Sequence, residues 1–151
     1  HMVVEPLPRP LAKRIAARGI LWVPTLELWQ GVQQRHGIHW GDIAVANTGV
    51  FFREGGKIAL GTDFGGYDTP FDRGFPQTEV LLLQKAGLSP MDIIVAGTRH
   101  AAEASGRLAD LGTIEPGKRA DMLMVHGDPL TDLRAVFSPA QVWLDGEPVR
   151  D

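Results

Sequence analysis

Asp63 is the residue whose type and surroundings are best suited to chemistry. It follows a short apolar run, Ile58-Ala59-Leu60, and it precedes a glycine-rich stretch from Phe64 to Phe75. Catalytic groups of α/β proteins gather at the carboxyl ends of parallel strands. A carboxylate in that place could ligate a divalent metal or accept a proton from water. The competing interpretation is that Asp63 only caps a turn through its own backbone.

The histidines point to chemistry less clearly. His36 and His39 lie three residues apart and could chelate a metal, although a solvated loop is the simpler interpretation. We expect His100 to face solvent or cap a helix break, and His126 to lie at the surface where a strand ends. The chain contains no HExxH, GxSxG, GxGxxG or P-loop pattern, so the enzyme classes that these motifs mark gain no support.

Composition excludes several other classes. The 151 residues carry 15 basic and 18 acidic side chains, and 44% are apolar. The net charge of -3 gives no electrostatic case for binding nucleic acid or an anionic membrane. Without cysteine the chain can form neither a disulfide nor a thiolate metal site. No apolar run approaches the roughly 20 residues that cross a bilayer, and no leader opens the chain, so we expect a cytoplasmic protein.

The elements that must position Asp63 alternate between strand and helix. Residues 20–23 form an unbroken apolar run, which indicates a strand buried on both faces, and residues 58–60 form a second. The pattern predicts helices over 8–18, 42–53, 77–86 and 90–105, whereas 27–39 reads as irregular with helical pieces. Strand–helix–strand order implies parallel pairing. Two covered strands leave open edges, so the chain looks incomplete.

The pattern changes near Arg107. Pro116-Gly117 suits the centre of a type II turn, and residues 122–125 and 141–144 read as short strands. Asp145-Gly146 suits a tight hairpin turn. We therefore expect a strand-rich second unit over 107–151.

These motifs together resemble the amidohydrolase superfamily. Residues 58–63, Ile-Ala-Leu-Gly-Thr-Asp, are similar to its eighth-strand motif. Residues 77–79, 86–90 and 96–104 are similar to the segments that follow. The most specific run is Leu111 to Asp121 with Gly127-Asp128-Pro129-Leu130, which resembles the passage from the barrel into the small β domain. The likeness is nearest to the imidazolonepropionase-like and prolidase-like branch.

The resemblance implies an α/β fold: the C-terminal part of a (β/α)8 TIM barrel, about strands 7 and 8 with their helices, plus strands of a small β-sandwich-like domain. Residues 1–106 would belong to the barrel and 107–151 to the composite β domain. The family uses one or two divalent metal ions, commonly zinc, to activate the water that cleaves an amide or cyclic amide. Asp63 would ligate the metal, accept the proton of the attacking water and pass it to the leaving amine.

The departures from the family pattern concern the other ligands. The first-strand His-x-His, the fourth-strand lysine and the fifth-strand histidine have no counterparts here. A catalytic zinc keeps three protein ligands, so the isolated chain should be inactive. His1-Met2-Val3 resembles the end of the sixth strand, which would make His1 a metal ligand; His1-Met2 is equally consistent with a remnant of expression cloning.

The remaining candidates have structural interpretations beside functional ones. Thr25 could face the pocket, Asp68 and Asp72 are expected to be solvated unless they touch substrate, and Asp121 is expected to support a turn. Trp22 and Trp143 are expected to pack in the core or between domains.

Three hypotheses follow. The chain is the C-terminal fragment of a metal-dependent amidohydrolase, acting on a small-molecule substrate with a complementary N-terminal barrel segment or chain. Alternatively, it is a non-catalytic piece that covers its open edges by forming a homo-oligomer. The third hypothesis is a small-molecule binding module that uses the loop from Phe64 to Phe75.

Overall fold

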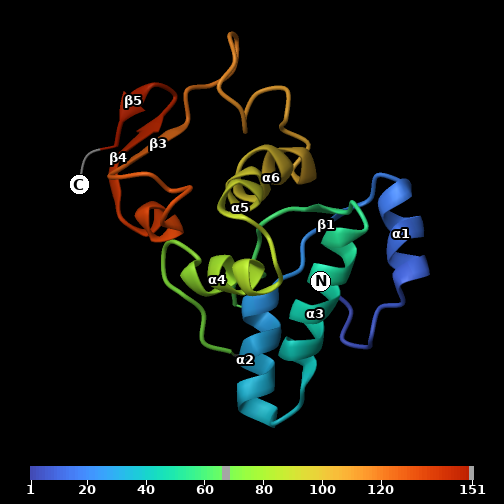
Figure 1. Cartoon of the computed structure of the whole chain (residues 1–151). Helices are drawn as coiled ribbons and strands as arrows, with labels where there is room; N and C mark the ends of the chain where they lie inside the picture. The colour runs from blue at the N-terminus through green and yellow to red at the C-terminus, as the bar shows by residue number, and fades with distance from the viewer. Residues whose placement is uncertain (66–68, 150–151) are drawn as a thin grey trace.

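The computed structural model describes residues 1–65 and 69–149. Helices dominate the first two thirds of the chain, and a small sheet occupies the last third (Figure 1). The elements are α1 (Arg9–Ala17), β1 (Leu21–Trp22), α2 (Leu26–His36), α3 (Trp40–Arg53), β2 (Lys57–Ile58), α4 (Gln77–Lys85), α5 (Pro90–Gly97), α6 (Arg99–Ala104), β3 (Met122–Val125), the 3₁₀ helix η2 (Leu133–Phe137), β4 (Pro139–Leu144) and β5 (Glu147–Pro148).

The two strands that precede the candidate site pair in parallel, as predicted. Leu21 lies opposite Lys57 and Trp22 opposite Ile58. The strands are shorter than the apolar runs suggested, and β1 is only half-buried, whereas burial on both faces was predicted. The reason is that β1 has one neighbouring strand within the described residues, so its other side is not enclosed by a sheet.

Helix α2 corrects the prediction of an irregular segment over 27–39. The helix runs without a break to His36 and is followed by Gly37, whose positive φ of 66° suits glycine. It packs against both α3 and α4, so side chains are buried around most of its first two turns. A helix that is covered on more than one side lacks the single apolar stripe by which a surface helix is recognised.

Helices α3 and α4 approach closely because of a glycine. A Cβ on Gly49 would lie 2.4 Å from the carbonyl oxygen of Ala86, just after α4. The contact is with backbone, which cannot rotate away. Gly49 therefore sets the distance between the helix that leads into β2 and the helix that follows the site loop.

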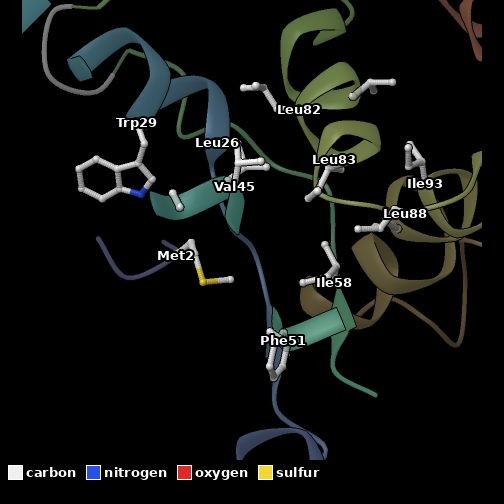
Figure 2. Packing of buried hydrophobic residues seen from close by; sticks show 14 of the residues in the cluster. Met2, Leu26, Trp29, Val45, Phe51, Ile58, Leu82, Leu83, Leu88 and Ile93 are labelled. Carbon is white, nitrogen blue, oxygen red and sulfur yellow. The ribbon is translucent and has the colours of Figure 1, made fainter. Parts of the chain in front are cut away.

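One apolar core joins these helices to both strands. Figure 2 shows Met2, Phe51, Ile58 and Leu83 within it, and each of the four is at least 98% buried. The Trp22 ring contacts Phe51 edge-on with ring centroids 5.0 Å apart. Burying one such side chain contributes about 1.5–3 kcal/mol, so this core holds the two strand ends in fixed positions.

Helix α5 begins as the sequence predicts. The Ser89 hydroxyl accepts the backbone N–H of Asp92, and the Asp92 carboxylate accepts the backbone N–H of Ser89. Pro90 occupies the first turn, where no N–H is needed. This capping box fixes where α5 begins.

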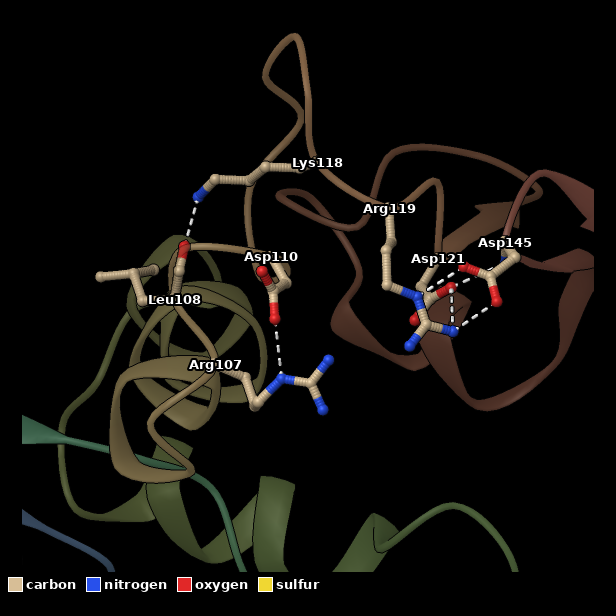
Figure 3. A network of polar contacts seen from close by, with 7 residues as sticks. All are labelled: Arg107, Leu108, Asp110, Lys118, Arg119, Asp121 and Asp145. Carbon is tan, nitrogen blue, oxygen red and sulfur yellow. Dashed lines mark hydrogen bonds and ion pairs between the residues drawn. The ribbon is translucent and has the colours of Figure 1, made fainter.

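The C-terminal sheet is antiparallel, in the order β3-β4-β5. The predicted hairpin is confirmed: Asp145 and Gly146 have φ values of 54° and 81° between β4 and β5. Asp121 supports this turn as expected, because its carboxylate accepts the backbone N–H of Asp145. Arg119 binds the Asp145 carboxylate through two nitrogens, which ties the hairpin to the preceding segment (Figure 3).

Lys118 holds the connection between the helices and this sheet. Its ammonium donates to the Leu108 carbonyl at 2.7 Å (Figure 3). It also donates to the Thr113 hydroxyl at 2.6 Å, and the Lys118 side chain is only 12% exposed. A largely apolar groove of about 840 Å³ lies between α5–α6 and the segment that runs from Leu111 into β3.

Within the described residues, no helix is both long and apolar enough to span a membrane.

Candidate functional site

Asp63 and His1 come together at one end of the parallel strand pair. Asp63 lies five residues beyond Ile58, the last residue of β2. The Nε2 atom of His1 lies 3.6 Å from Oδ2 of Asp63, and the two side chains are 46% and 51% exposed. An imidazole nitrogen and a carboxylate oxygen therefore face one another where solvent and a small molecule can reach them.

The backbone is strained where both strands end. Thr25, three residues after β1, has φ 54°, and Asp63 has φ 57°. Left-handed backbone is uncommon for residues with a side chain and is a genuine outlier for a β-branched one such as Thr25. Such conformations cluster at functional sites, where the surrounding packing holds them.

His1 is held from three sides. Its Nδ1 lies 2.6 Å from the Thr25 hydroxyl, and its carbonyl accepts the indole N–H of Trp22 at 2.6 Å. The ring of Trp29, from α2, meets the imidazole edge-on at a centroid distance of 5.6 Å. The next residue, Met2, is buried and donates its backbone N–H to the carbonyl of Pro24. Thr25, for which the sequence only suggested a pocket-facing position, thus contacts the candidate site directly.

The donor pair fits part of a metal site. Two ligands at about 2.1 Å from a tetrahedral zinc ion lie about 3.4 Å apart, close to the observed separation. Imidazole nitrogen and carboxylate oxygen are both zinc ligands. Over residues 1–65 and 69–149, however, no group of three or more potential ligands comes together. The described chain supplies two ligands and not a complete set.

Two buried glutamates near the site were not anticipated. Glu79, in α4, is fully buried, and its Oε2 accepts the backbone N–H of Glu27, in the first turn of α2, at 2.7 Å. Glu27 is itself 4% exposed. Burial raises the pKa of Glu27 and raises that of Glu79 to about 7, with the nearby Glu27 charge adding to the effect on Glu79. One oxygen of each carboxyl has no hydrogen-bond partner within the described residues.

A chain of carboxylate-to-backbone bonds continues from Glu27 into the site loop. Glu27 Oε1 accepts the backbone N–H of Asp72, and Asp72 Oδ2 accepts that of Thr78, both at 2.5 Å. Asp72 is therefore engaged with backbone, contrary to the expectation of a solvated loop acid. A hollow of about 210 Å³ lies between this loop and α2. The only sequence signal was Glu79 itself, a charged residue within an otherwise apolar helical stripe.

The structure also places the remaining histidines that the sequence singled out. His100 is part-buried and its Nδ1 lies 2.8 Å from the Ile58 carbonyl, so the expectation that it faces solvent or caps a break is wrong. His39 lies 3.8 Å from the Asp42 carboxylate, and neither His36 nor His39 belongs to a metal-binding group within the described chain. His126 is exposed after β3, as expected. Asp68 lies outside the described residues.

The relatives in sequence are imidazolonepropionases and a deaminase. The model of the amidohydrolase family matches residues 42–149. An imidazolonepropionase from Deinococcus deserti is 36% identical over 99 residues, which cover 64% of this chain and 22% of that protein. A 5-methylthioadenosine/S-adenosylhomocysteine deaminase from Teredinibacter turnerae is 28% identical over 119 residues, 66% of this chain and 27% of that protein. The chain thus spans about a quarter of either relative.

Solved structures show the same fold. A Xaa-Pro dipeptidase with bound methionine superposes with a TM-score of 0.83 at 23% identity, over 96% of this chain and 38% of that one. A putative prolidase from Bifidobacterium longum gives a TM-score of 0.76 at 28% identity, over 97% of this chain and 40% of that one. The superposition includes both the helical part and the C-terminal sheet, since it covers nearly every residue. The chain belongs to the amidohydrolase family, in the branch that contains the imidazolonepropionases and the prolidase-like proteins.

Proposed function

We propose that this chain is the C-terminal part of a metal-dependent amidohydrolase that hydrolyses amide or cyclic amide C–N bonds. One observation carries the proposal: His1 Nε2 and the Asp63 carboxylate face each other, 3.6 Å apart, at the ends of neighbouring chain segments. The C–N bond chemistry follows from the family, whose matching relatives include an imidazolonepropionase and a deaminase.

In this proposal β1 and β2 are the seventh and eighth strands of a (β/α)8 barrel, and residues 1–3 end the sixth. The bond from the Met2 N–H to the Pro24 carbonyl supports that order, because it places the first residues alongside the end of β1. Residues 1–106 would belong to the barrel, and 107–151 to a small β domain with a sandwich-like arrangement. The separate sheets β1-β2 and β3-β4-β5 are consistent with that division.

His1 and Asp63 share one task, and Asp63 has a second. His1 Nε2 and one Asp63 oxygen would hold a divalent ion, zinc being the one that suits this donor set. When bound, such an ion lowers the pKa of a coordinated water from its bulk value towards 7. The Asp63 carboxylate accepts the proton that the attacking water loses and delivers it to the leaving amine. Its half-exposed position leaves room for both transfers.

The other ligands would come from a complementary N-terminal barrel segment, on the same polypeptide or a separate one. Two findings support this partner. The chain covers 38% of the length of the dipeptidase structure that it resembles. The 840 Å³ groove beside α5 and α6 is lined largely by apolar side chains, which further strands would cover.

A second candidate function is a non-catalytic, self-associating fragment. The observation in its favour is β3, an edge strand whose Met122, Leu123 and Met124 are 37–50% exposed. Exposed apolar edges promote pairing with another copy. Sedimentation of the isolated chain tests this candidate, because a compact monomer would count against it.

The decisive experiment uses the chain together with its complementary segment. The protein is stripped with a chelator, reloaded with zinc, and assayed against N-acyl amino acids, Xaa-Pro dipeptides and cyclic amides. We expect hydrolysis that the chelator abolishes, and an Asp63→Asn variant slower by about 10²–10⁴-fold, the usual contribution of a positioned acid–base group. Asp128→Asn, an exposed acid in the C-terminal unit, is the matched control and should keep full activity. Full activity of Asp63→Asn, or hydrolysis unaffected by chelation, would refute the proposal.

A further inference from the structure

The His1 imidazole lies between two groups that make different demands on its nitrogens. Nδ1 lies 2.6 Å from the Thr25 hydroxyl oxygen, and Nε2 lies 3.6 Å from the Asp63 carboxylate. A neutral imidazole carries one proton, on one nitrogen or the other. Which nitrogen carries it decides which lone pair is free.

The hydrogen bonds of Thr25 settle the position of that proton. The Thr25 Oγ1 lies 2.7 Å from the carbonyl oxygen of Pro24. A carbonyl has no proton to donate, so the hydroxyl must be the donor in that bond. A hydroxyl has a single proton, so towards His1 its oxygen can only accept. The proton between Thr25 and His1 therefore belongs to Nδ1, and the lone pair of Nε2 faces Asp63.

The backbone of Thr25 adopts a conformation that threonine rarely takes, which is a second and independent observation on this residue. Its φ of 54° is unfavourable for a β-branched side chain, and the residue is 96% buried. Packing alone would be satisfied by valine, which has the same shape as threonine. The hydroxyl, with one bond to Pro24 and one to His1, is what threonine adds at this position.

We propose that Thr25 is a positioning residue that fixes His1 in the Nδ1–H tautomer and so presents the unprotonated Nε2 towards Asp63. The inference rests on the proposed function in one respect, namely that Nε2 is the atom a metal would need. Hydrogen bonds to the second nitrogen orient histidine ligands in metal sites and set their tautomer. Here the partner of Nδ1 is the Thr25 hydroxyl, which donates its own proton to the Pro24 carbonyl.

The test reads the tautomer directly. Nitrogen-15 spectra of the metal-free chain are recorded at pH 9, where imidazole is neutral, and the His1 signals are identified by their loss in His1→Ala. We expect the wild type and Thr25→Ser to give the Nδ1–H tautomer. Thr25→Val keeps the shape and removes the acceptor, so the ratio of tautomers should move by about tenfold towards Nε2–H, the effect of one hydrogen bond.

Several results would overturn the inference. A wild-type spectrum with the proton on Nε2 would do so, as would an unchanged tautomer ratio in Thr25→Val. If Thr25→Val does not fold, judged by its amide spectrum, Thr25→Ala replaces it with the same expectation. The measurement involves neither metal nor substrate, so it can fail while hydrolysis by the assembled protein is confirmed, and the reverse can also occur.

Discussion

Replacing Glu79 by glutamine should stabilise the chain at alkaline pH and remove much of its pH dependence. Glu79 is fully buried in α4, and its pKa is raised from 4.5 to about 7, chiefly by desolvation. One oxygen accepts the backbone N–H of Glu27, while the other has no partner within the described residues. Glutamine keeps a side-chain oxygen that can accept the Glu27 N–H, and the glutamine side chain is uncharged at every pH.

The sign and size of the change in the free energy of unfolding follow from the pKa of Glu79 in the unfolded and in the folded chain. Below pH 4.5 the carboxyl is protonated in both the folded and unfolded states, and its contribution to stability is complete. Between pH 4.5 and 7 the unfolded chain loses the proton first, so the free energy of unfolding falls as pH rises, and above pH 7 the loss is constant. A difference between 4.5 and about 7 corresponds to about 3 kcal/mol. That is a large share of the roughly 5–15 kcal/mol of a typical domain.

Urea unfolding at pH 4 and pH 8 measures the effect. We expect Glu79→Gln to unfold at nearly the wild-type free energy at pH 4 and to be more stable by up to about 3 kcal/mol at pH 8. Some slope should remain, because burial also raises the pKa of Glu27. Glu147→Gln, an exposed glutamate in β5, is the control and should leave the slope unchanged. Equal slopes in wild type and Glu79→Gln would show that Glu79 does not titrate in this range and would refute the reasoning.

Three further substitutions test the scaffold, each by urea unfolding. Gly49→Ala should destabilise by about 1–3 kcal/mol, because the new Cβ would meet the Ala86 carbonyl 2.4 Å away; wild-type stability would mean that α3 and α4 are not so close. Ser89→Ala should cost about 0.5–2 kcal/mol by removing the cap of α5, and an unchanged midpoint would argue against the capping box. Lys118→Met should cost about 1–3 kcal/mol, since it removes the charged donor to Leu108 and Thr113; a neutral effect would mean that water replaces both bonds.

Local features of the fold could be predicted from the sequence because they depend on neighbouring residues. The Ser89 cap and the Asp145-Gly146 turn are of this kind. The parallel pairing of β1 and β2 is not local, and it could be predicted because strand–helix–strand order implies it. Helix α2 was missed because its burial comes from α3 and α4, which lie elsewhere in the sequence. A pattern search looks for one apolar face, and this helix has more than one covered face.

The same limit applies to predicting the candidate site from the sequence. Asp63 was identified because its position after an apolar run is a local signal, and the placement of His1 depended on the family resemblance. The contact of His1 with Thr25, 24 residues away, could not be predicted from spacing. The bond between Glu79 and the backbone of Glu27, 52 residues apart, was equally hidden. Side chains brought together by tertiary packing leave no periodic trace in the sequence.

Location of the metal in the assembled protein tests the central claim most directly. Crystals of the chain with its complementary segment, loaded with zinc, are measured above and below the zinc absorption edge. We predict an anomalous peak within about 2.0–2.2 Å of both an Asp63 oxygen and His1 Nε2. A zinc peak elsewhere, with Asp63 and His1 left without metal contacts, would contradict the account.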